Sequence, residues 1–218
     1  MTASGKLPDQ ALQVRQLTLG ERLPTTAEAL EPRLALWLMD QPHSAAERQG
    51  RDSTLRLRFA PLISSALAGE LDAWAGSPRR RLSLVLLLDT FTRILHAGTA
   101  RAFEGNARAL ALTLSGVQSG ADAALDVTER IFFYAPLQHS ESVEVQHESL
   151  AAYRRLAQEA AAALQPALHR VLALAEARHA LIVRFGRFPE RNRLLNRSST
   201  PAESAYLAEQ RARAQRPA

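Results

Sequence analysis

Three residues that follow a strongly apolar segment have the types and the spacing to form one polar helix face. Asp89, Arg93 and His96 come directly after residues 82–88, and gaps of four and three residues place them on the same side of a helix. Two interpretations are open. Either Asp89 and Arg93 form a local ion pair that contributes little to stability, or the three side chains are a polar stripe that faces an internal cavity.

A histidine and a glutamate follow the aromatic run 132–134, where another helix is expected to start. The helix dipole favours a carboxylate there, which gives Glu141 a structural role, whereas His139 could act as a general base or a metal ligand. Together with His147 and His179, these residues could in principle form a His/carboxylate metal site. Their spacing matches no well-defined metal motif, so we expect no metal and no cofactor.

The most unusual segment, residues 182–192, alternates arginine with phenylalanine in a loop that must follow a helix. Such a stretch could bind nucleic acid by stacking and phosphate contacts. However, the five arginines from Arg184 to Arg197 are few for that purpose, and no recognition module surrounds them. Arginine forks also bind carboxylate or phosphate groups of small molecules. The structural alternative is an arginine network that pairs with acids such as Asp89 and Glu141.

The basic excess of the chain is local. The chain carries 27 basic and 22 acidic residues, a formal net charge of +5. Residues 178–218 alone contain nine arginines and three glutamates, so the rest of the chain is nearly neutral. One arginine-rich end favours a binding site or an ion-pair network over general binding of polyanions.

The elements that position these residues are predicted to be helices. The chain contains 40 Ala and 35 Leu, both strong helix formers, but only 12 Val and Ile. We therefore expect an all-α protein of six to eight helices in antiparallel pairs, arranged as a tetratricopeptide-like superhelix or a bundle. Residues 1–30 are weakly patterned and predict an N-terminal extension or loosely packed arm, and residues 31–218 predict a single all-helical domain.

Several helix boundaries are marked by proline, glycine and capping residues. Thr200-Pro201-Ala202-Glu203 is a capping box with proline at the first helical position. Gly98 and Gly186 are placed to end helices. The expected helical ranges are 53–69, Pro78–His96, Ala100–Val117, Thr128–Tyr134, Ser142–Leu164, Pro166–Arg184 and a last helix from Pro201.

Composition also excludes classes of function. The chain has no cysteine, which removes disulfides, thiolate nucleophiles and thiolate metal sites. The longest apolar run, residues 82–88, falls far short of the roughly 18 residues that span a bilayer. The N-terminus is not followed by the apolar segment of a secretory signal. We expect a cytoplasmic protein without membrane contact.

The three chemistry-bearing segments together resemble the bacterial family called domain of unknown function 924, over roughly residues 34–210. The similarity lies in the Trp74 region and in several runs with matching order and spacing. These runs are 88–93 (Leu-Asp-Thr-Phe-Thr-Arg), 98–103 (Gly-Thr-Ala-Arg-Ala-Phe), 136–141 (Pro-Leu-Gln-His-Ser-Glu) with Gln146, 184–189 (Arg-Phe-Gly-Arg-Phe-Pro) and 199–201 (Ser-Thr-Pro). The resemblance implies an all-helical, tetratricopeptide-like fold and no established activity.

The residues that match the family pattern form the candidate site: Asp89, Arg93, His139, Glu141, Gln146, His179, Arg187, Arg191 and Asn192, to which we add Arg197. The chain departs from that pattern at Thr90, Thr92, Ile94, His96, Asn106, Glu190 and Asn196. These departures predict a divergent member with altered ligand choice or without catalysis.

Two hypotheses of function follow. The first is a pocket lined by arginine and histidine for an anionic small molecule. In that pocket His139 or His179 would be the acid/base, Glu141 its orienting partner, and Arg187 and Arg191 the anion clamp. The second is a tetratricopeptide-like scaffold for a protein partner, without catalysis. Nucleic-acid binding is a weaker third hypothesis, and whether the chain is an enzyme stays open.

Overall fold

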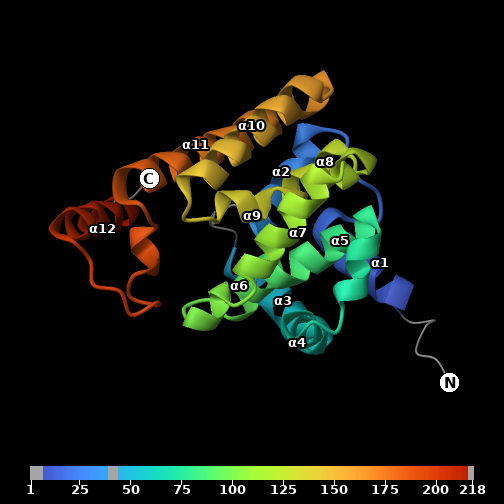
Figure 1. Cartoon of the computed structure of the whole chain (residues 1–218), viewed down its shortest axis with the longest axis horizontal. Coiled ribbons are helices and arrows are strands. Elements are labelled where there is room, and N and C mark those ends of the chain that lie inside the picture. The colour runs from blue at the N-terminus through green and yellow to red at the C-terminus, as the bar shows by residue number, and fades with distance from the viewer. Residues whose placement is uncertain (1–6, 39–43, 216–218) are drawn as a thin grey trace.

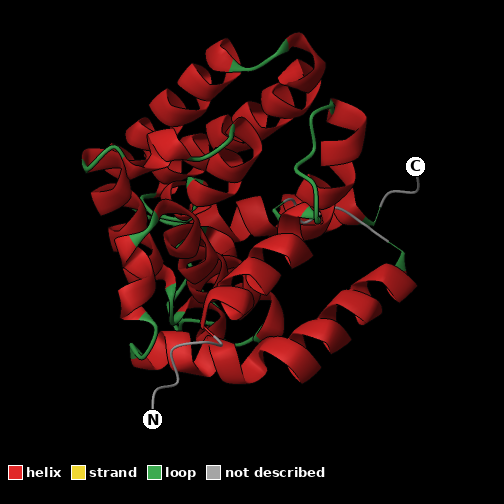
Figure 2. Cartoon of the chain, turned by 90° about the vertical axis from the view of Figure 1, so that its right-hand side faces the viewer, coloured by secondary structure: helices red, strands yellow, loops and turns green. Residues whose placement is uncertain are grey.

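The fold is that of a computed structural model, which describes residues 7–38 and 44–215. Within these ranges every regular element is helical and no strand is present (Figures 1 and 2), so the all-α prediction is confirmed. The α-helices are α1 (Leu7–Leu19), α2 (Ala27–Trp37), α3 (Ala45–Thr54), α4 (Ala60–Ala68), α5 (Pro78–Leu86), α6 (Thr92–Leu95), α7 (Asn106–Gln118), α8 (Val127–Phe133), α9 (Ala135–Gln138), α10 (Val143–Glu159), α11 (Gln165–Phe185) and α12 (Pro201–Ala214).

Two of the long helices contain a π-helical turn. Leu55–Phe59 joins α3 to α4, and Leu87–Phe91 joins α5 to α6. When each of these is treated as one continuous helix, the number of helices comes close to the predicted six to eight. The expected helix Ala100–Val117 is wrong in its first part, because a 3-10 turn at Ala100–Phe103 precedes α7.

The local helix signals have the predicted effect at both ends of the arginine-rich segment. Gly186 ends α11 with a φ of 70°, a left-handed conformation that favours glycine. Thr200 and Glu203 form the predicted capping box at the start of α12. These two boundaries define the loop that carries the remaining arginines.

Helix α1 is packed into the body, whereas the sequence pattern predicted an extension or loose arm for this region. Val14 and Leu19 are fully buried, and Ala11 is nearly so. The hydroxyl of Ser83 on α5 donates to the backbone carbonyl of Ala11 at 2.7 Å. The apolar residues of α1 therefore contribute to the core, although their spacing in the sequence is too irregular to indicate it.

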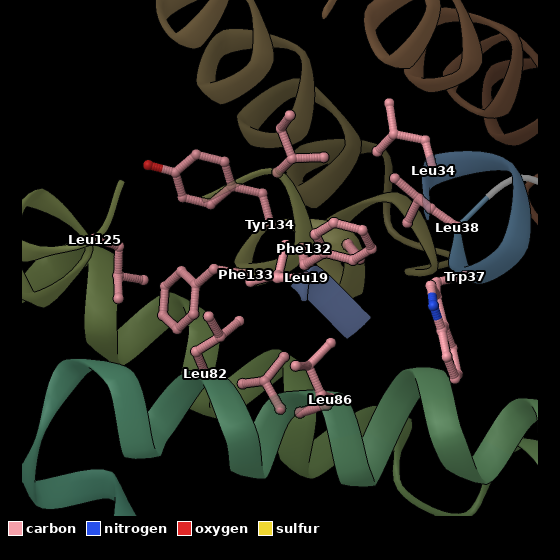
Figure 3. Close-up of a cluster of buried hydrophobic side chains, with 14 of the residues drawn as sticks. Leu19, Leu34, Trp37, Leu38, Leu82, Leu86, Leu125, Phe132, Phe133 and Tyr134 are labelled. Carbon is pink, nitrogen blue, oxygen red and sulfur yellow. The ribbon is translucent and has the colours of Figure 1, made fainter. Parts of the chain in front are cut away.

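The core is built around α5. Leu82 and Leu86 of this helix are fully buried, and they point toward the aromatic rings of Phe132 and Phe133 from α8 (Figure 3). Burial on nearly every side explains why residues 82–88 are apolar without a polar face. Because the helix continues directly into the π turn Leu87–Phe91, the residues of that turn are buried as well.

Helices α10 and α11 form an antiparallel hairpin, and α12 lies beyond the end of α11, away from α1 (Figure 1). The Arg-rich loop between α11 and α12 thus turns back toward the body. Among the described residues no helix has the length and apolarity needed to cross a membrane. The tetratricopeptide-like superhelix stays a prediction.

Candidate functional site

A buried histidine–aspartate pair joins two of the predicted motifs. Asp89, in the π turn after α5, is 1% exposed, and His139, at the end of α9, is 7% exposed. Nδ1 of His139 lies 2.8 Å from Oδ1 and 2.7 Å from Oδ2 of Asp89. The partner of Asp89 is therefore 50 residues away in the sequence, which favours the internal polar stripe over the local ion pair.

The π turn Leu87–Phe91 sets the direction of the Asp89 carboxylate. Such a turn adds one residue to a helix and often marks a functional site. The hydroxyl of Thr92 donates to the carbonyl of Leu87 at 2.7 Å. The backbone of Gly105 packs on the turn so closely that an added Cβ would lie 1.9 Å from the carbonyl oxygen of Leu88. The turn is thus held by its own threonine and by the chain that precedes α7.

The electrostatic environment determines the protonation of this pair. Burial, assisted by the charges of Arg93 and Arg178, lowers the pKa of His139 to about 3, although Asp89 acts in the opposite direction. For Asp89, burial acts to raise the pKa, but the attraction and hydrogen bond of His139 and the two arginines outweigh it and lower the pKa. At neutral pH a neutral His139 therefore donates its Nδ1–H to an ionised Asp89, and Nε2 carries the lone pair.

Two arginines that act on this pair have buried donors without an acceptor. Arg93 belongs to α6 and Arg178 to α11, and the charges of both influence Asp89 and His139. Nη1 of Arg93 and Nε of Arg178 are buried and have no hydrogen-bond partner within the described residues. Burial, with repulsion from Arg93, lowers the pKa of Arg178 to about 10. Sequence analysis did not select Arg178 as a site residue. The sequence feature that could have indicated it is its position as the first arginine of the basic segment 178–218.

Arg191 links the loop to the histidine. Its Nη2 donates to the backbone carbonyl of His139 at 2.9 Å. Its guanidinium lies over two rings, 4.3 Å from the centroid of Phe188 and 5.1 Å from that of Phe103. Burial, followed by repulsion from Arg93, lowers the pKa of Arg191 to about 10. Arg191 therefore positions His139 from the backbone side and brings a third positive charge to the same centre.

Glu141 is not the orienting partner of His139, which corrects the prediction from sequence. Its carboxylate accepts two hydrogen bonds from Arg197, at 2.6 and 3.0 Å, and one from the backbone N–H of Phe188 at 2.9 Å. Burial acts to raise the pKa of Glu141, but these donors outweigh it and lower the pKa. Glu141 and Arg197 thus anchor the loop after α11, and Asp89 orients the histidine.

Arg187 also lies outside the anion clamp that the sequence predicted. Its Nε and Nη2 donate to the two carboxylate oxygens of Glu203, at 2.6 and 2.9 Å, and Nη2 also donates to the carbonyl of Ser198. Glu203 is the acid of the capping box of α12, so a single carboxylate fastens both the helix start and the preceding loop. Arg187 is therefore engaged at the start of α12 and not at the buried pair.

This arrangement makes the α12 cap insensitive to mild acid. The hydrogen bonds from Arg187, followed by that from the backbone N–H of Thr200, lower the pKa of Glu203 to about 2. A lowered folded-state pKa stabilises the fold above the ordinary value of 4.5, and the effect is lost as the pH falls toward 2. We expect the Thr200 amide resonance in NMR spectra to titrate with a midpoint near 2 and not near 4.5. The transition should be absent in Glu203→Gln, and a midpoint near 4.5 would contradict the cap geometry.

Three amide side chains of the chemistry-bearing segments are buried, and two of them, Gln146 and Asn192, were predicted. Nε2 of Gln146 donates to the carbonyls of Gln138 and Ser140, which closes the end of α9 beneath His139. Asn192 donates to the hydroxyl of Ser199 and so shapes the loop. Gln138, which the sequence did not single out, is fully buried, and neither of its amide atoms has a partner within the described residues.

His179 does not join the buried pair. Its ring lies 4.9 Å from that of His147, between helices α11 and α10, whereas His139 is bound to Asp89. Across the part of the chain that the structure describes, no group of three or more His, Asp or Glu side chains is placed to hold a metal ion. The metal set considered from sequence is therefore not brought together.

Two cavities near the C-terminal end lie beside this centre and not at it. One, of about 600 Å³, is lined by residues 184–187 of the α11 terminus and by Thr200, Ala202 and Glu203 of the α12 start. The other, of about 410 Å³, is lined by Pro189, Glu190, Arg193, Arg197, Ser199, Leu207 and Arg211. Neither cavity is lined by Asp89 or His139. We therefore locate the candidate site by the buried donors that lack a partner and not by these two cavities.

Comparison with known proteins places the chain in a family of unknown function. The family described as "Bacterial protein of unknown function (DUF924)" matches residues 34–211. A similar solved structure is that of protein of unknown function ATU0120 from Agrobacterium tumefaciens, whose sequence is 29% identical to this chain. The two structures superpose with a TM-score of 0.63, and the match covers 84% of this chain and 98% of the other. No curated protein matches. Because the family match spans most of the sequence, the chain belongs to the DUF924 family of bacterial proteins.

Proposed function

We propose that this protein binds an anionic small molecule between Arg93 and Arg178, and that His139 acts there as a general base. The observation that carries the proposal is the pair of buried guanidinium nitrogens that lack an acceptor. A buried, unsatisfied donor on a charged group is costly, and it is maintained where a missing partner completes the site. An anion supplies that partner.

The buried pair is suited to proton transfer. Asp89 accepts the Nδ1–H of His139 and thereby holds the imidazole in one tautomer and one orientation. Nε2 is left as the basic atom, able to take a proton from a hydroxyl group of a ligand or from water. A bound anion would oppose the effect of the two arginines and raise the pKa of His139 from about 3 toward the range where a general base works well.

The protein-scaffold hypothesis has less support. Among the described residues the large hydrophobic side chains that are exposed are Leu12, Leu57 and Val183. They belong to α1, to the π turn before α4 and to α11, so they do not form one groove. Isolated exposed apolar residues are ordinary on protein surfaces. The polar centre, by contrast, contains the buried side chains of Asp89, His139 and Arg191.

A thermal-shift series with phosphorylated and carboxylated metabolites tests the anion site. We expect at least one anion to raise the Tm in a saturable way, because a ligand at about 100 times its Kd stabilises by roughly 2.7 kcal/mol. The shift should disappear in Arg178→Met and Arg93→Met. It should persist in Arg154→Met, since Arg154 of α10 is 56% exposed and pairs with Glu176 at the surface. No shift with any anion, or an equal loss in all three variants, would refute the proposal.

A further inference from the structure

Resting on this proposed anion site, we infer that its ligand carries a doubly charged phosphoryl group, held by Arg93, Arg178 and the amide of Gln138. The three side chains come from α6, α11 and α9, so they approach the centre from different elements. Each has a buried nitrogen without a partner within the described residues: Nη1 of Arg93, Nε of Arg178 and Nε2 of Gln138.

The charge of the centre favours a dianion. Arg93, Arg178 and Arg191 influence one another's charges, and Asp89 is the fully buried acid among them. Glu141 is neutralised by its two hydrogen bonds from Arg197. The acid Glu190 also acts on Arg178 and Arg191, but its side chain is exposed and its charge is screened by solvent. Arg93, Arg178 and Arg191, the last of which also lies 3.8 Å from Glu141, thus outnumber Asp89 by two, and a phosphomonoester carries about two negative charges near neutral pH.

The donors also favour a tetrahedral group over a carboxylate. A phosphomonoester has three terminal oxygens that accept hydrogen bonds, and the site offers three unpaired donors from three different helices. A monocarboxylate can also accept three hydrogen bonds, but its acceptor sites lie in one plane and its single charge would leave one positive charge uncompensated. The neighbouring Tyr153 hydroxyl donates to the carbonyl of Ile131 and keeps its lone pairs as acceptors, and its interaction with Gln138 acts to lower the pKa of Tyr153.

The centre further couples binding to protons. His139 is neutral in the unliganded site because burial and the two arginines oppose its charging. A phosphoryl dianion between those arginines reverses part of that effect, so binding is expected to draw a proton toward His139. The ligand itself loses its second charge below about pH 6. Proton uptake by His139 favours binding at lower pH, whereas the loss of the ligand's second charge opposes it, so acidification is expected to weaken binding of a phosphomonoester relative to binding of an anion whose charge is constant.

Isothermal titration calorimetry of the full chain with glycerol 3-phosphate, sulfate and acetate tests the inference. We expect glycerol 3-phosphate and sulfate to bind at pH 7.5 and acetate to bind at least ten-fold more weakly. Between pH 6 and pH 5 the affinity for glycerol 3-phosphate should fall by about five-fold while that for sulfate does not fall, because only the phosphomonoester loses a charge there. If acetate binds as tightly as glycerol 3-phosphate, this inference fails and the anion site stands. If none of the three binds and the metabolite series also gives no shift, both fail.

Two variants locate the binding. Gln138→Leu removes two buried amide atoms that have no partner, so it should fold, and we expect its affinity for glycerol 3-phosphate to drop by about ten-fold. Arg211→Gln, which alters the cavity of about 410 Å³ beside α12, should bind as the parent does. Loss of binding in Arg211→Gln with full binding in Gln138→Leu would place the phosphate in that outer cavity and overturn the inference. Should Gln138→Leu fail to fold, Arg178→Met and the pH dependence of the parent protein decide the question.

Discussion

Replacing Asp89 by asparagine is expected to lower the free energy of unfolding by about 3–5 kcal/mol, the range measured when one partner of a buried charge pair is removed. The substitution keeps the size of the side chain but removes the buried negative charge that acts on both Arg93 and Arg178. The imidazole of His139 also loses the carboxylate that receives its Nδ1–H. Urea unfolding followed by circular dichroism measures the change.

The matched control is Asp72→Asn. Asp72 also pairs with an arginine, Arg108, but its side chain is 66% exposed. Exposed pairs contribute about 0–1 kcal/mol, so this variant should stay close to the parent. In the double variant Asp89→Asn/Arg178→Met the loss should be smaller than the sum of the single effects, because one uncompensated cation is removed. A loss below about 1 kcal/mol in Asp89→Asn would mean that the pair is solvated and not buried.

The pH dependence of stability should report the same group. Because the folded-state pKa of Asp89 lies below its ordinary value of 3.8, its ionisation stabilises the fold above that value and the effect is lost as the pH falls through the folded pKa. The parent should therefore lose stability between neutral pH and strong acid more steeply than Asp89→Asn does. Parallel acid titrations of the two proteins, with His139 unchanged in both, measure this difference.

The second large effect is expected at Gly105, where alanine should cost about 3 kcal/mol, the upper end of the range for overpacking. An added Cβ would lie 1.9 Å from the carbonyl oxygen of Leu88 and 2.7 Å from its carbonyl carbon. These are backbone atoms, so no side-chain rotation relieves the contact, and the π turn that carries Asp89 must move. Anion binding should fall together with stability, because the carboxylate moves with the turn.

Gly50→Ala provides a control of opposite sign. Gly50 lies inside α3, and a Cβ there would meet no atom within 4 Å. Alanine is more favourable than glycine in a helix interior by roughly 0.5–1 kcal/mol, so this variant should be slightly more stable than the parent. The denaturant midpoints of Gly105→Ala and Gly50→Ala, each compared with the parent, measure the two effects. Equal effects at both positions would contradict the close approach at Gly105.

The two predictions concern opposite sides of one structural unit. Asp89 is the ionisable residue of the π turn. Gly105 has no side chain, so the segment before α7 can lie against the backbone of that turn. A family member that lacked either residue would be expected to lose the pairing with His139. Thr92 is one of the positions predicted to depart from the family pattern, and its hydroxyl satisfies the carbonyl of Leu87 within the same unit.

Several features of the fold could be predicted from the sequence because their causes are local. Helix propensity summed over an Ala- and Leu-rich chain indicates an all-α protein. The capping box from Thr200 to Glu203 and the left-handed Gly186 act within a few residues, and both appear as expected. The sequence also contained Asp89, His139 and Arg191 in recognisable segments, so most members of the buried centre were named in advance.

The partners of those residues were decided by the tertiary structure. Asp89 and His139 are 50 residues apart, and Glu141 and Arg197 are 56 apart. Nothing in the spacing of the two acids tells which will reach the histidine and which will hold the loop. Arg178 and Gln138 could not be selected for the same reason, since their distinguishing property is a buried donor without an acceptor. That property depends on the approach of α6, α9 and α11.

The sequence by itself therefore determined the helical class, several helix boundaries and the residue types available for chemistry, because propensity, capping and periodicity act over one or two turns. The packing of helices that are distant in sequence decided the rest. It buried α1, paired Asp89 with His139, assigned Arg187 to the α12 cap and left Arg93 and Arg178 unpaired. Hydrogen bonds and charge interactions depend on distances of a few ångströms, and in this chain those distances are set by the packing of whole helices.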